Sequence, residues 1–279
     1  MATPTSSAML PELAEADAPP HIAAIYREMR ETTAAPMVAL IWRHLATFPG
    51  VIEEFWAAVG PLFRAGLVQQ TAWDGARDAV TAAPASVTPA ALAAAGIPAE
   101  GQAAYLRVLQ AYNRVNPINF MVVALLLHRL DYQGPPRTTL DTTGTWQPLP
   151  PLGDIAPMAP VAALAGAPRR IVDALCADPS VDRSTVVPSL YRHLTGWPAL
   201  YPAIHTALAP RFASGEILAQ MDAVRCVLRA HAARLGDGIG PLHRLAEVAD
   251  VRAAFKRFSS LIPEMVVVGT LLERGMRGT

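Results

Sequence analysis

The sequence predicts an all-α protein built from two pseudo-symmetric helical halves that form an intramolecular pseudo-dimer. Residues 36–66 align without a gap with residues 185–215, at a spacing of 149, and nine of the 31 positions are identical. Apolar residues recur at helical spacing, and no segment shows sustained strand alternation. A duplicated unit in one chain behaves like a fused dimer, so a site on its internal two-fold axis can become asymmetric.

The first half is predicted to span residues 1–132. Its helices are expected at 20–30, 36–46, 50–66, in a broken stretch over 69–94, and at 99–113 and 117–130. Thr88 has the chemistry of an N-cap, and Pro89 suits the first helical position after it. Pro49 and Pro117 are expected to end the helices that precede them, because proline disfavours the helical conformation of the residue before it.

A connector over residues 133–160 is predicted to follow, and it contains seven prolines. Such a segment is expected to be extended and to lack a core of its own. The second half, 161–279, repeats the order of the first: a short helix, a break at Trp197-Pro198, a long helix and a final apolar helix over 263–274. That last helix matches 117–128 at an offset of 146.

The composition excludes several classes of partner. The 279-residue chain carries 23 basic and 23 acidic residues, so it lacks the positive charge typical of a nucleic-acid or membrane-surface binder. The longest strongly apolar run, residues 120–127, is too short to span a bilayer, and no secretory signal is recognisable, so a cytoplasmic protein is expected. Hydrophobic residues make up 52% of the chain, which favours a hidden interface in a homo- or hetero-oligomer.

Common catalytic motifs are absent from the sequence. It contains no glycine-rich phosphate loop, no His-Glu-x-x-His or Cys-x-x-Cys spacing and no Gly-x-Ser-x-Gly turn. Neither a metal nor another cofactor is therefore predicted. His44 and His193 are paired by the repeat, and their position beside aromatic residues fits a structural role.

The two apolar helices offer a first candidate site, because each is expected to begin at a proline. A helix start presents unpaired N–H groups and a positive partial charge, which suit a carboxylate or sulfate. Asn116 and Asn119 lie there in the first half, whereas Ile262 and Met265 match them in the second, with Glu264 between. In the alternative, structural interpretation, Asn116 only satisfies a turn and Glu264 only stabilises its helix start.

Four short segments resemble the group I 2-haloacid dehalogenases. They are Ala-Pro-Met-Val-Ala-Leu with Leu-Ala-Thr-Phe-Pro-Gly (35–40 and 45–50), Asn-Arg-Val-Asn-Pro (113–117) and Trp197-Pro198. The resemblance implies an all-helical protein of two repeats that needs no cofactor. It also implies displacement of halide from either enantiomer of a 2-haloacid by direct attack of water. The site would lie between the repeats, where an asparagine and an aspartate hold and deprotonate the water.

The resemblance also assigns roles to residues of this chain. Asn116 matches the water-holding asparagine, and Ser189 matches a serine beside the base. The residues that match pocket-lining positions are Met37, Ala39 and Leu40. The position of the catalytic aspartate is occupied by Leu190. Leucine cannot deprotonate water, and general-base catalysis typically contributes about 10²- to 10⁴-fold, so ordinary hydrolysis is not expected.

The favoured hypothesis keeps the displacement and changes the nucleophile. The amine of a small carboxylate-bearing or amino-acid-derived substrate would attack its own carbon, closing an aziridine-type ring with loss of halide or sulfate. Asn116 and Asn119 would orient the amine or the carboxylate, and Glu264 would accept a proton. Arg43 or Arg192 would bind the departing anion or the carboxylate, although either could instead form structural ion pairs.

Two further hypotheses stay open at this point. The first is residual 2-haloacid hydrolysis with a relocated base, either Glu264 or Asp182. The second is a binding subunit without catalysis, which uses the inherited pocket for a carboxylate ligand or stabilises a partner chain.

Overall fold

The computed structural model describes residues 11–158 and 188–279, together with Leu164, Gly166, Arg169, Val172, Asp173 and Leu175 between them. The elements before the connector are η1 (Glu15–Asp17), α1 (Pro20–Thr33), α2 (Leu40–Leu45), α3 (Val51–Arg64), α4 (Leu67–Ala79), α5 (Pro89–Ala94) and α6 (Ala99–Asp131). Those after it are α8 (Ser189–Leu194), η3 (Pro198–Leu200), α9 (Tyr201–Ala213), α10 (Glu216–Gly236), α11 (His243–Glu247) and α12 (Ala249–Arg277). The all-α prediction is confirmed for this described part of the chain.

Local sequence explains the start of α5, whereas α2 begins later than its pattern predicts. Thr88 caps α5 as expected, because its side-chain oxygen accepts a hydrogen bond from the Ala91 N–H at 3.2 Å. The helix predicted at 36–46 begins only at Leu40. Ala34 ends α1 in the left-handed conformation (φ 51°) and Ala39 is extended, so the chain turns before α2 starts.

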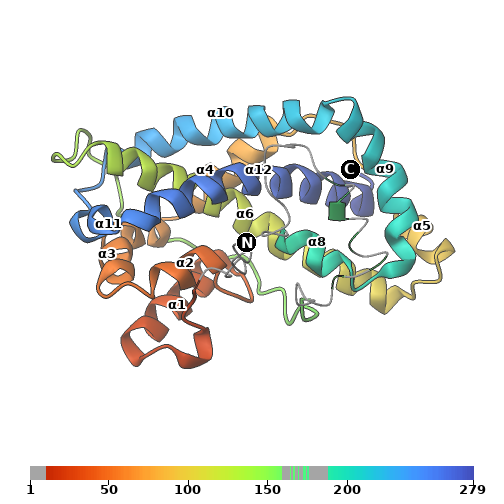
Figure 1. Cartoon of the computed structure of the whole chain (residues 1–279), viewed down its shortest axis with the longest axis horizontal. Helices are drawn as coiled ribbons and strands as arrows, with labels where there is room; N and C mark the ends of the chain where they lie inside the picture. Colours follow the sequence, from red (N-terminus) through yellow and green to blue (C-terminus); the bar gives the residue numbers. More distant parts are fainter. Residues whose placement is uncertain are drawn as a thin grey trace, which may run out of the picture.

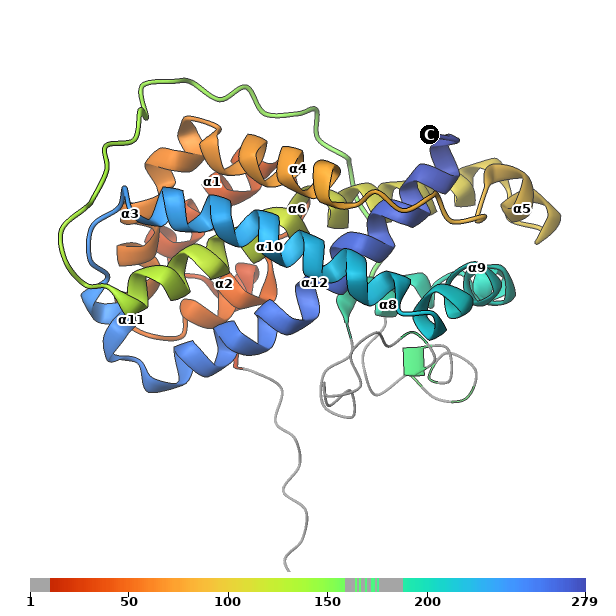
Figure 2. The ribbon, with the colours of Figure 1, turned by 90° about the horizontal axis from the view of Figure 1, so that it is seen from above.

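The prediction that Pro117 and Pro263 begin helices is wrong. α6 runs from Ala99 to Asp131 and α12 from Ala249 to Arg277, each with its proline inside. An internal proline removes one backbone hydrogen bond, costs about 3 kcal/mol and bends the helix. Both prolines are buried between buried neighbours, so packing offsets that cost. Figure 2 shows α12 changing direction along its length.

The continuity of α6 and α12 leaves no helix start at which an anion could bind beside the two candidate side chains. Asn116 and Glu264 do not lie at helix N-termini, so no row of unpaired backbone N–H groups is available beside either side chain. Any role of Asn116 and Glu264 in a binding site therefore depends on the contacts of their own side chains.

The two long helices lie side by side and run in opposite directions (Figure 1). At one end of the contact, Arg252 near the start of α12 pairs with Asp131 at the end of α6, at 2.6 Å. At the other end, Asn113 Nδ2 of α6 donates to Glu273 Oε2 of α12, also at 2.6 Å. We call the region where α6 and α12 face each other, flanked by α2 and α8, the seam.

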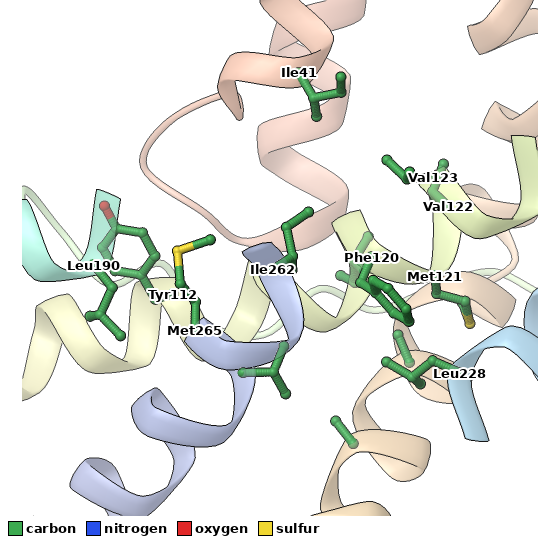
Figure 3. Close-up of a cluster of buried hydrophobic side chains, with 14 of the residues drawn as sticks. Ile41, Tyr112, Phe120, Met121, Val122, Val123, Leu190, Leu228, Ile262 and Met265 are labelled. Carbon is green, nitrogen blue, oxygen red and sulfur yellow. The ribbon is translucent and has the colours of Figure 1, made fainter. Parts of the chain in front are cut away.

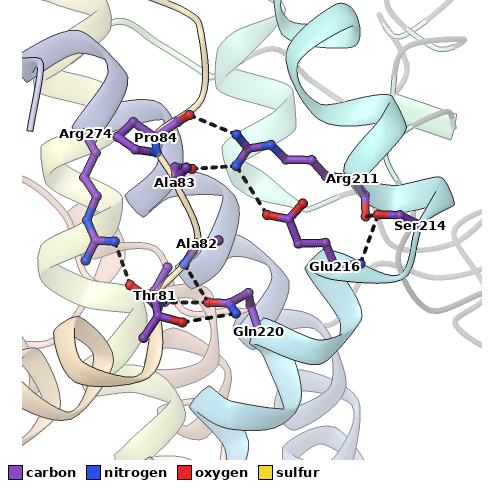
Figure 4. A network of polar contacts seen from close by, with 10 residues as sticks. Thr81, Ala82, Ala83, Pro84, Arg211, Ser214, Glu216, Gln220 and Arg274 are labelled. Atoms are coloured by element: carbon purple, nitrogen blue, oxygen red, sulfur yellow. Dashed lines mark hydrogen bonds and ion pairs between the residues drawn. The ribbon is translucent and has the colours of Figure 1, made fainter.

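Helices from both halves pack across each other instead of forming two separate bodies. α10 contacts α4 and α6, and a side chain at Gly75 of α4 would place its Cβ 2.8 Å from Leu228 of α10. A polar network joins the loop after α4 to α9 and α10 (Figure 4). In it, Arg211 donates to the Ala83 and Pro84 carbonyls at 2.5 and 3.0 Å, and Gln220 accepts from the Thr81 N–H at 2.8 Å.

The helix bounds recur along the chain at the spacing found in the sequence. α2 covers 40–45 and α8 covers 189–194, while α3 begins at 51 and the η3–α9 segment reaches the equivalent of Val51 at Leu200. The spatial two-fold relation between the halves stays a prediction.

The described part of the connector, 133–158, contains no helix and is fastened to both halves. On the first half, Trp146 donates from its backbone N–H to the Arg64 carbonyl at 2.7 Å and from its indole to the Thr32 carbonyl at 2.9 Å. On the second half, the Arg137 N–H donates to the Asp237 carbonyl at 2.7 Å. None of the helices in the described part of the chain has the length and hydropathy of a transmembrane span.

Candidate active site

Apolar side chains fill the seam around Leu190 (Figure 3). Leu190 of α8 is completely buried and lies beside Tyr112 of α6 and Met265 of α12. Ile41 of α2 and Ile262 of α12 extend the cluster toward the first half. The position that the resemblance gives to the catalytic aspartate is therefore an apolar position turned into the protein.

Two of the three predicted pocket-lining residues of the first half meet at a small cavity. Met37 and Ala39 line a cavity of about 20 Å³ together with Trp42 and Asn119. That volume has room for about one water molecule. Leu40, which begins α2 and is half-buried, is not among the residues that line it.

Asn119 and Glu264 each accept a hydrogen bond from an aromatic residue at equivalent positions of the repeat. The Trp42 indole donates to Asn119 Oδ1 at 2.9 Å, and the Tyr191 hydroxyl donates to Glu264 Oε1 at 2.6 Å. Both acceptors are buried, at 6% and 2% exposure. Tyr191 lines a second cavity of about 10 Å³, so Glu264 is held toward the second half.

Asn116 is buried, and its Nδ2 group has no hydrogen-bond partner among the described residues. One helical turn earlier, Asn113 Nδ2 binds Glu273, while Asn113 Oδ1 is buried without a partner in the same described part. Residues three apart lie on one face of a helix, so a donor and an acceptor are both unsatisfied on this face of α6. Such groups are unusual and fit the recognition of a polar ligand.

The two candidate arginines differ in their surroundings. Arg43 binds Glu12 through Nε and Nη2 at 2.7 and 2.6 Å, and its Nη1 donates to the Val38 carbonyl at 2.8 Å. It therefore fastens the segment before η1 to α2, which agrees with the structural alternative. Arg192 is half-buried, and burial lowers its pKa, an effect opposed by Tyr112 and Glu12.

Ser189 begins α8 and is half-buried, close enough to the Tyr112 hydroxyl to oppose the rise that burial causes in the pKa of that phenol. The same hydroxyl lies 2.7 Å from Nδ1 of His193. Sequence reasoning assigned His193 a structural role and did not place Tyr112 in a site. The only signal available was that the repeat matches Tyr112 with Phe258, so that one half carries a hydroxyl and the other does not.

A larger pocket of about 420 Å³ opens at the end of the seam between α6 and α12. Its lining includes four arginines against one glutamate: Arg77, Arg114, Arg274, Arg277 and Glu273. Asn113 lines it as well. A side chain at Gly269 would place its Cβ 2.4 Å from Asn113 Oδ1 and 3.7 Å from Leu190 Cδ2, so this glycine lies between Asn113 and the apolar cluster.

The sequence analysis predicted none of the charged residues of this pocket, and Arg114 is the one among them that lies within a resembling segment. Its Nη1 donates to the Ala34 and Pro150 carbonyls at 2.8 Å each, and burial lowers its pKa while Glu273 opposes that effect. The sequence offered a signal, because Arg114 lies within the segment 113–117 that carries the resemblance.

No protein-family model matches the sequence, and no curated protein matches it. Solved structures do share its fold. A D-2-haloacid dehalogenase in complex with L-LA matches with a TM-score of 0.71 and 16% identity, over 99% of this chain and 97% of that chain. A mutant of a D-2-haloacid dehalogenase with D-2-CPA matches with a TM-score of 0.71 and 17% identity over the same shares. At these identities the likeness establishes a common fold, in agreement with the resemblance found in the sequence.

Proposed function

We propose that this protein catalyses a cofactor-independent nucleophilic displacement in which the amine of a small amino-acid-derived substrate closes an aziridine-type ring, expelling halide or sulfate. The observation that carries the proposal is the complete burial of Leu190 at the seam, at the position that the resemblance gives to an aspartate. The fold shared with D-2-haloacid dehalogenases supports displacement of a leaving group as the underlying chemistry.

An apolar Leu190 favours an internal nucleophile over water. A neutral amine attacks carbon without the strong base that water needs. Holding it in line with the leaving group is worth up to about 7–11 kcal/mol of the barrier. Apolar side chains around the reacting atoms also exclude water, which would otherwise compete for the same carbon.

The two unsatisfied amides of α6 suit a substrate with an amine and an acidic group. Asn116 Nδ2 is a donor for a carboxylate or a departing anion, and Asn113 Oδ1 is an acceptor for an amine. The cavity at Met37 and Ala39 is too small for such a molecule, whereas the arginine-lined pocket beyond Gly269 has the volume of a ligand site. Its positive charge attracts the substrate carboxylate.

A product assay tests the proposal. The protein is incubated with 3-chloroalanine and with serine O-sulfate, and the products are followed by NMR, because elimination gives a product of the same mass that decays to pyruvate. We expect aziridine-2-carboxylate above the uncatalysed rate, and its loss in Asn116→Ala. Ring product at the background rate with both probes and with their β-branched homologues would overturn the proposal.

The second candidate is 2-haloacid hydrolysis with Glu264 as the base. It is favoured by the burial of Glu264, the one acidic residue among the buried side chains of the described chain. Asp182, the other candidate base, lies outside the described residues. Chloride release from 2-chloropropionate that disappears in Glu264→Gln supports hydrolysis, and its absence in the unaltered protein excludes it.

A further inference from the structure

A buried chain of hydrogen bonds connects α6, α8 and the end of the connector. The Tyr112 hydroxyl of α6 lies 2.7 Å from Nδ1 of His193 on α8. Nε2 of the same imidazole lies 2.9 Å from the Ala156 carbonyl. Tyr112 and His193 are 6% and 3% exposed, so water does not compete for these contacts.

The Ala156 carbonyl fixes the tautomer of His193. A carbonyl oxygen only accepts, so Nε2 carries the hydrogen, and Nδ1 of the neutral ring accepts from the Tyr112 hydroxyl. Burial lowers the pKa of His193, and the charge of Arg192 on the same helix lowers it further. Burial raises the pKa of Tyr112 well above its ordinary value. At neutral pH the pair is therefore a protonated phenol that donates to a neutral imidazole.

The equivalent histidine of the first half lacks this arrangement. Position 258 of α12, which the repeat matches with Tyr112, is phenylalanine and offers no hydroxyl. Nδ1 of His44 instead lies 2.7 Å from the Pro11 carbonyl, and its Nε2 has no partner in the described part of the chain. The tyrosine–histidine pair thus exists on one side of the seam only.

The Tyr112–His193 pair lies next to Leu190. Tyr112 packs beside Leu190 and Met265 in the apolar cluster (Figure 3), and its hydroxyl reaches α8 through His193, three residues after Leu190. Tyr112 and Asn116 are four residues apart on α6, which places them on the same helix face. The Tyr112 ring therefore lies beside Leu190, the position that the resemblance gives to the missing aspartate, while its hydroxyl points to His193 on α8.

We propose that Tyr112 is the proton acceptor of the ring closure and that His193 is the positioning residue which receives the proton through it. This inference rests on the proposed function, and it moves the proton-accepting role from Glu264 to Tyr112. The neutral amine nitrogen forms its bond to carbon as the bond from carbon to the leaving group breaks, and halide or sulfate departs with the bonding pair. One amine proton passes to the Tyr112 oxygen, and the Tyr112 proton passes to Nδ1 of His193.

The product state leaves both imidazole N–H groups bonded. Nδ1–H then donates to the Tyr112 oxygen, and Nε2–H donates to the Ala156 carbonyl. These two hydrogen bonds stabilise the imidazolium. The proton returns to solvent once the ring product and the anion have left. No co-reactant is needed.

Matched variants test the inference with 3-chloroalanine as the probe. Tyr112→Phe copies the natural residue of position 258, His193→Gln removes the proton sink, and His44→Gln is the control in the other half. We expect kcat for ring closure to fall about 10²- to 10⁴-fold in the first two, with KM within about threefold, and the control to keep its rate. Melting temperatures within a few degrees of the unaltered protein show that the fold is retained.

Two readouts separate a catalytic role from a structural one. In the unaltered protein, kcat falls as His193 becomes protonated on acidification, and the same transition appears in the imidazole NMR signals. The groups that face His193 are Tyr112 from α6 and Arg192 from α8, so Tyr112→Phe is expected to remove the pH-dependent limb while the NMR titration remains.

Each outcome decides the matter. Tyr112→Phe with an unchanged kcat overturns the inference while the proposed function stands. An unaltered protein that forms no ring product overturns both. A loss of rate in Glu264→Gln but not in His193→Gln would identify Glu264 as the proton acceptor, and it would also overturn the inference.

Discussion

The Tyr191 hydroxyl donates a hydrogen bond of 2.6 Å to Glu264 and so ties the short helix α8 to the long helix α12. The Trp42 indole ties α2 to α6 through Asn119 in the first half. Each half thus fixes its long helix with an aromatic donor from the short helix that precedes the Pro break. The two polar acceptors are held in place by these contacts, and this decides what their substitution does.

Substitutions of Glu264 separate its structural role from a catalytic one. Glu264→Gln keeps an oxygen that accepts from Tyr191, so we expect little change in stability and ring closure within about threefold of the unaltered protein. Glu264→Leu leaves the Tyr191 hydroxyl buried without that acceptor, at a cost of about 1–3 kcal/mol. Urea unfolding measures both variants. A Gln variant as destabilised as the Leu variant would contradict this account.

Asn116 is expected to trade stability for function. Its Nδ2 is a buried donor without a described partner, and such a group costs about 1–3 kcal/mol. Asn116→Leu should therefore match or exceed the unaltered protein in free energy of unfolding and lose ring closure. Asn119→Leu is the control, because it leaves the Trp42 indole unpaired and should destabilise the protein. A marked loss of stability in Asn116→Leu would argue that Asn116 is structural.

Leu190→Asp tests whether the seam still accommodates hydrolysis. A carboxylate at this apolar position is costly to bury, so we expect a loss of several kcal/mol in stability. In return, chloride release from 2-chloropropionate should rise at least about tenfold, because a general base is restored. Leu190→Asn is the control for a polar substitution, because the asparagine side chain has the shape of aspartate without its charge. Equal chloride release from both variants would refute the assignment of position 190.

The stability of the protein is expected to fall on mild acidification. Burial lowers the pKa of His193 from its ordinary value of 6.5, so the unfolded chain binds a proton that the folded chain does not. Stability is therefore greatest above about pH 6.5 and falls as the pH drops from there toward the folded-state pKa. Thermal unfolding at pH 5 to 8 should show a shallower decline in His193→Gln. Parallel curves for the two proteins would contradict the assignment.

Gly275→Ala should be strongly destabilising, because α12 passes directly over the chain between α4 and α5. A Cβ at Gly275 would lie 2.1 Å from the Ala85 carbonyl oxygen, and a backbone atom cannot move aside cheaply. Overpacking of this kind typically costs about 1–3 kcal/mol. Gly240→Ala is the control, since no atom lies within 4 Å of its Cβ position. Urea midpoints of the two variants should differ clearly.

The helices were predictable where local chemistry decides them. The apolar faces, the Thr88 cap and the absence of strands from residues 11–158 and 188–279 all follow from short-range patterns that the structure retains. The continuity of α6 and α12 through Pro117 and Pro263 was not predictable in this way. Proline is a local signal for a helix break, and only the packing of two buried helices against each other offsets it.

The candidate site was predictable in part for a similar reason. Met37 and Ala39, which the resemblance gives as pocket-lining positions, do line one small cavity, and Asn119 lies there with them. The contact of Tyr112 with His193 joins residues 81 apart in sequence and depends on how α8 packs on α6. Neither a tyrosine nor a histidine in the sequence indicates that the two side chains are in contact. The repeat shows only that Tyr112 and Phe258 differ.

The exposed connector has a consequence for how this molecule can be divided. Its middle residues are mostly at the surface, while helices on either side of it interlock through α4, α6, α10 and α12. A protease cut near Thr143 should therefore leave two fragments that stay together through denaturant-free chromatography. For the same reason, two polypeptides expressed separately and divided at this point should assemble into the folded protein. The contacts between the helices, and not the peptide bond of the connector, would hold the two parts together.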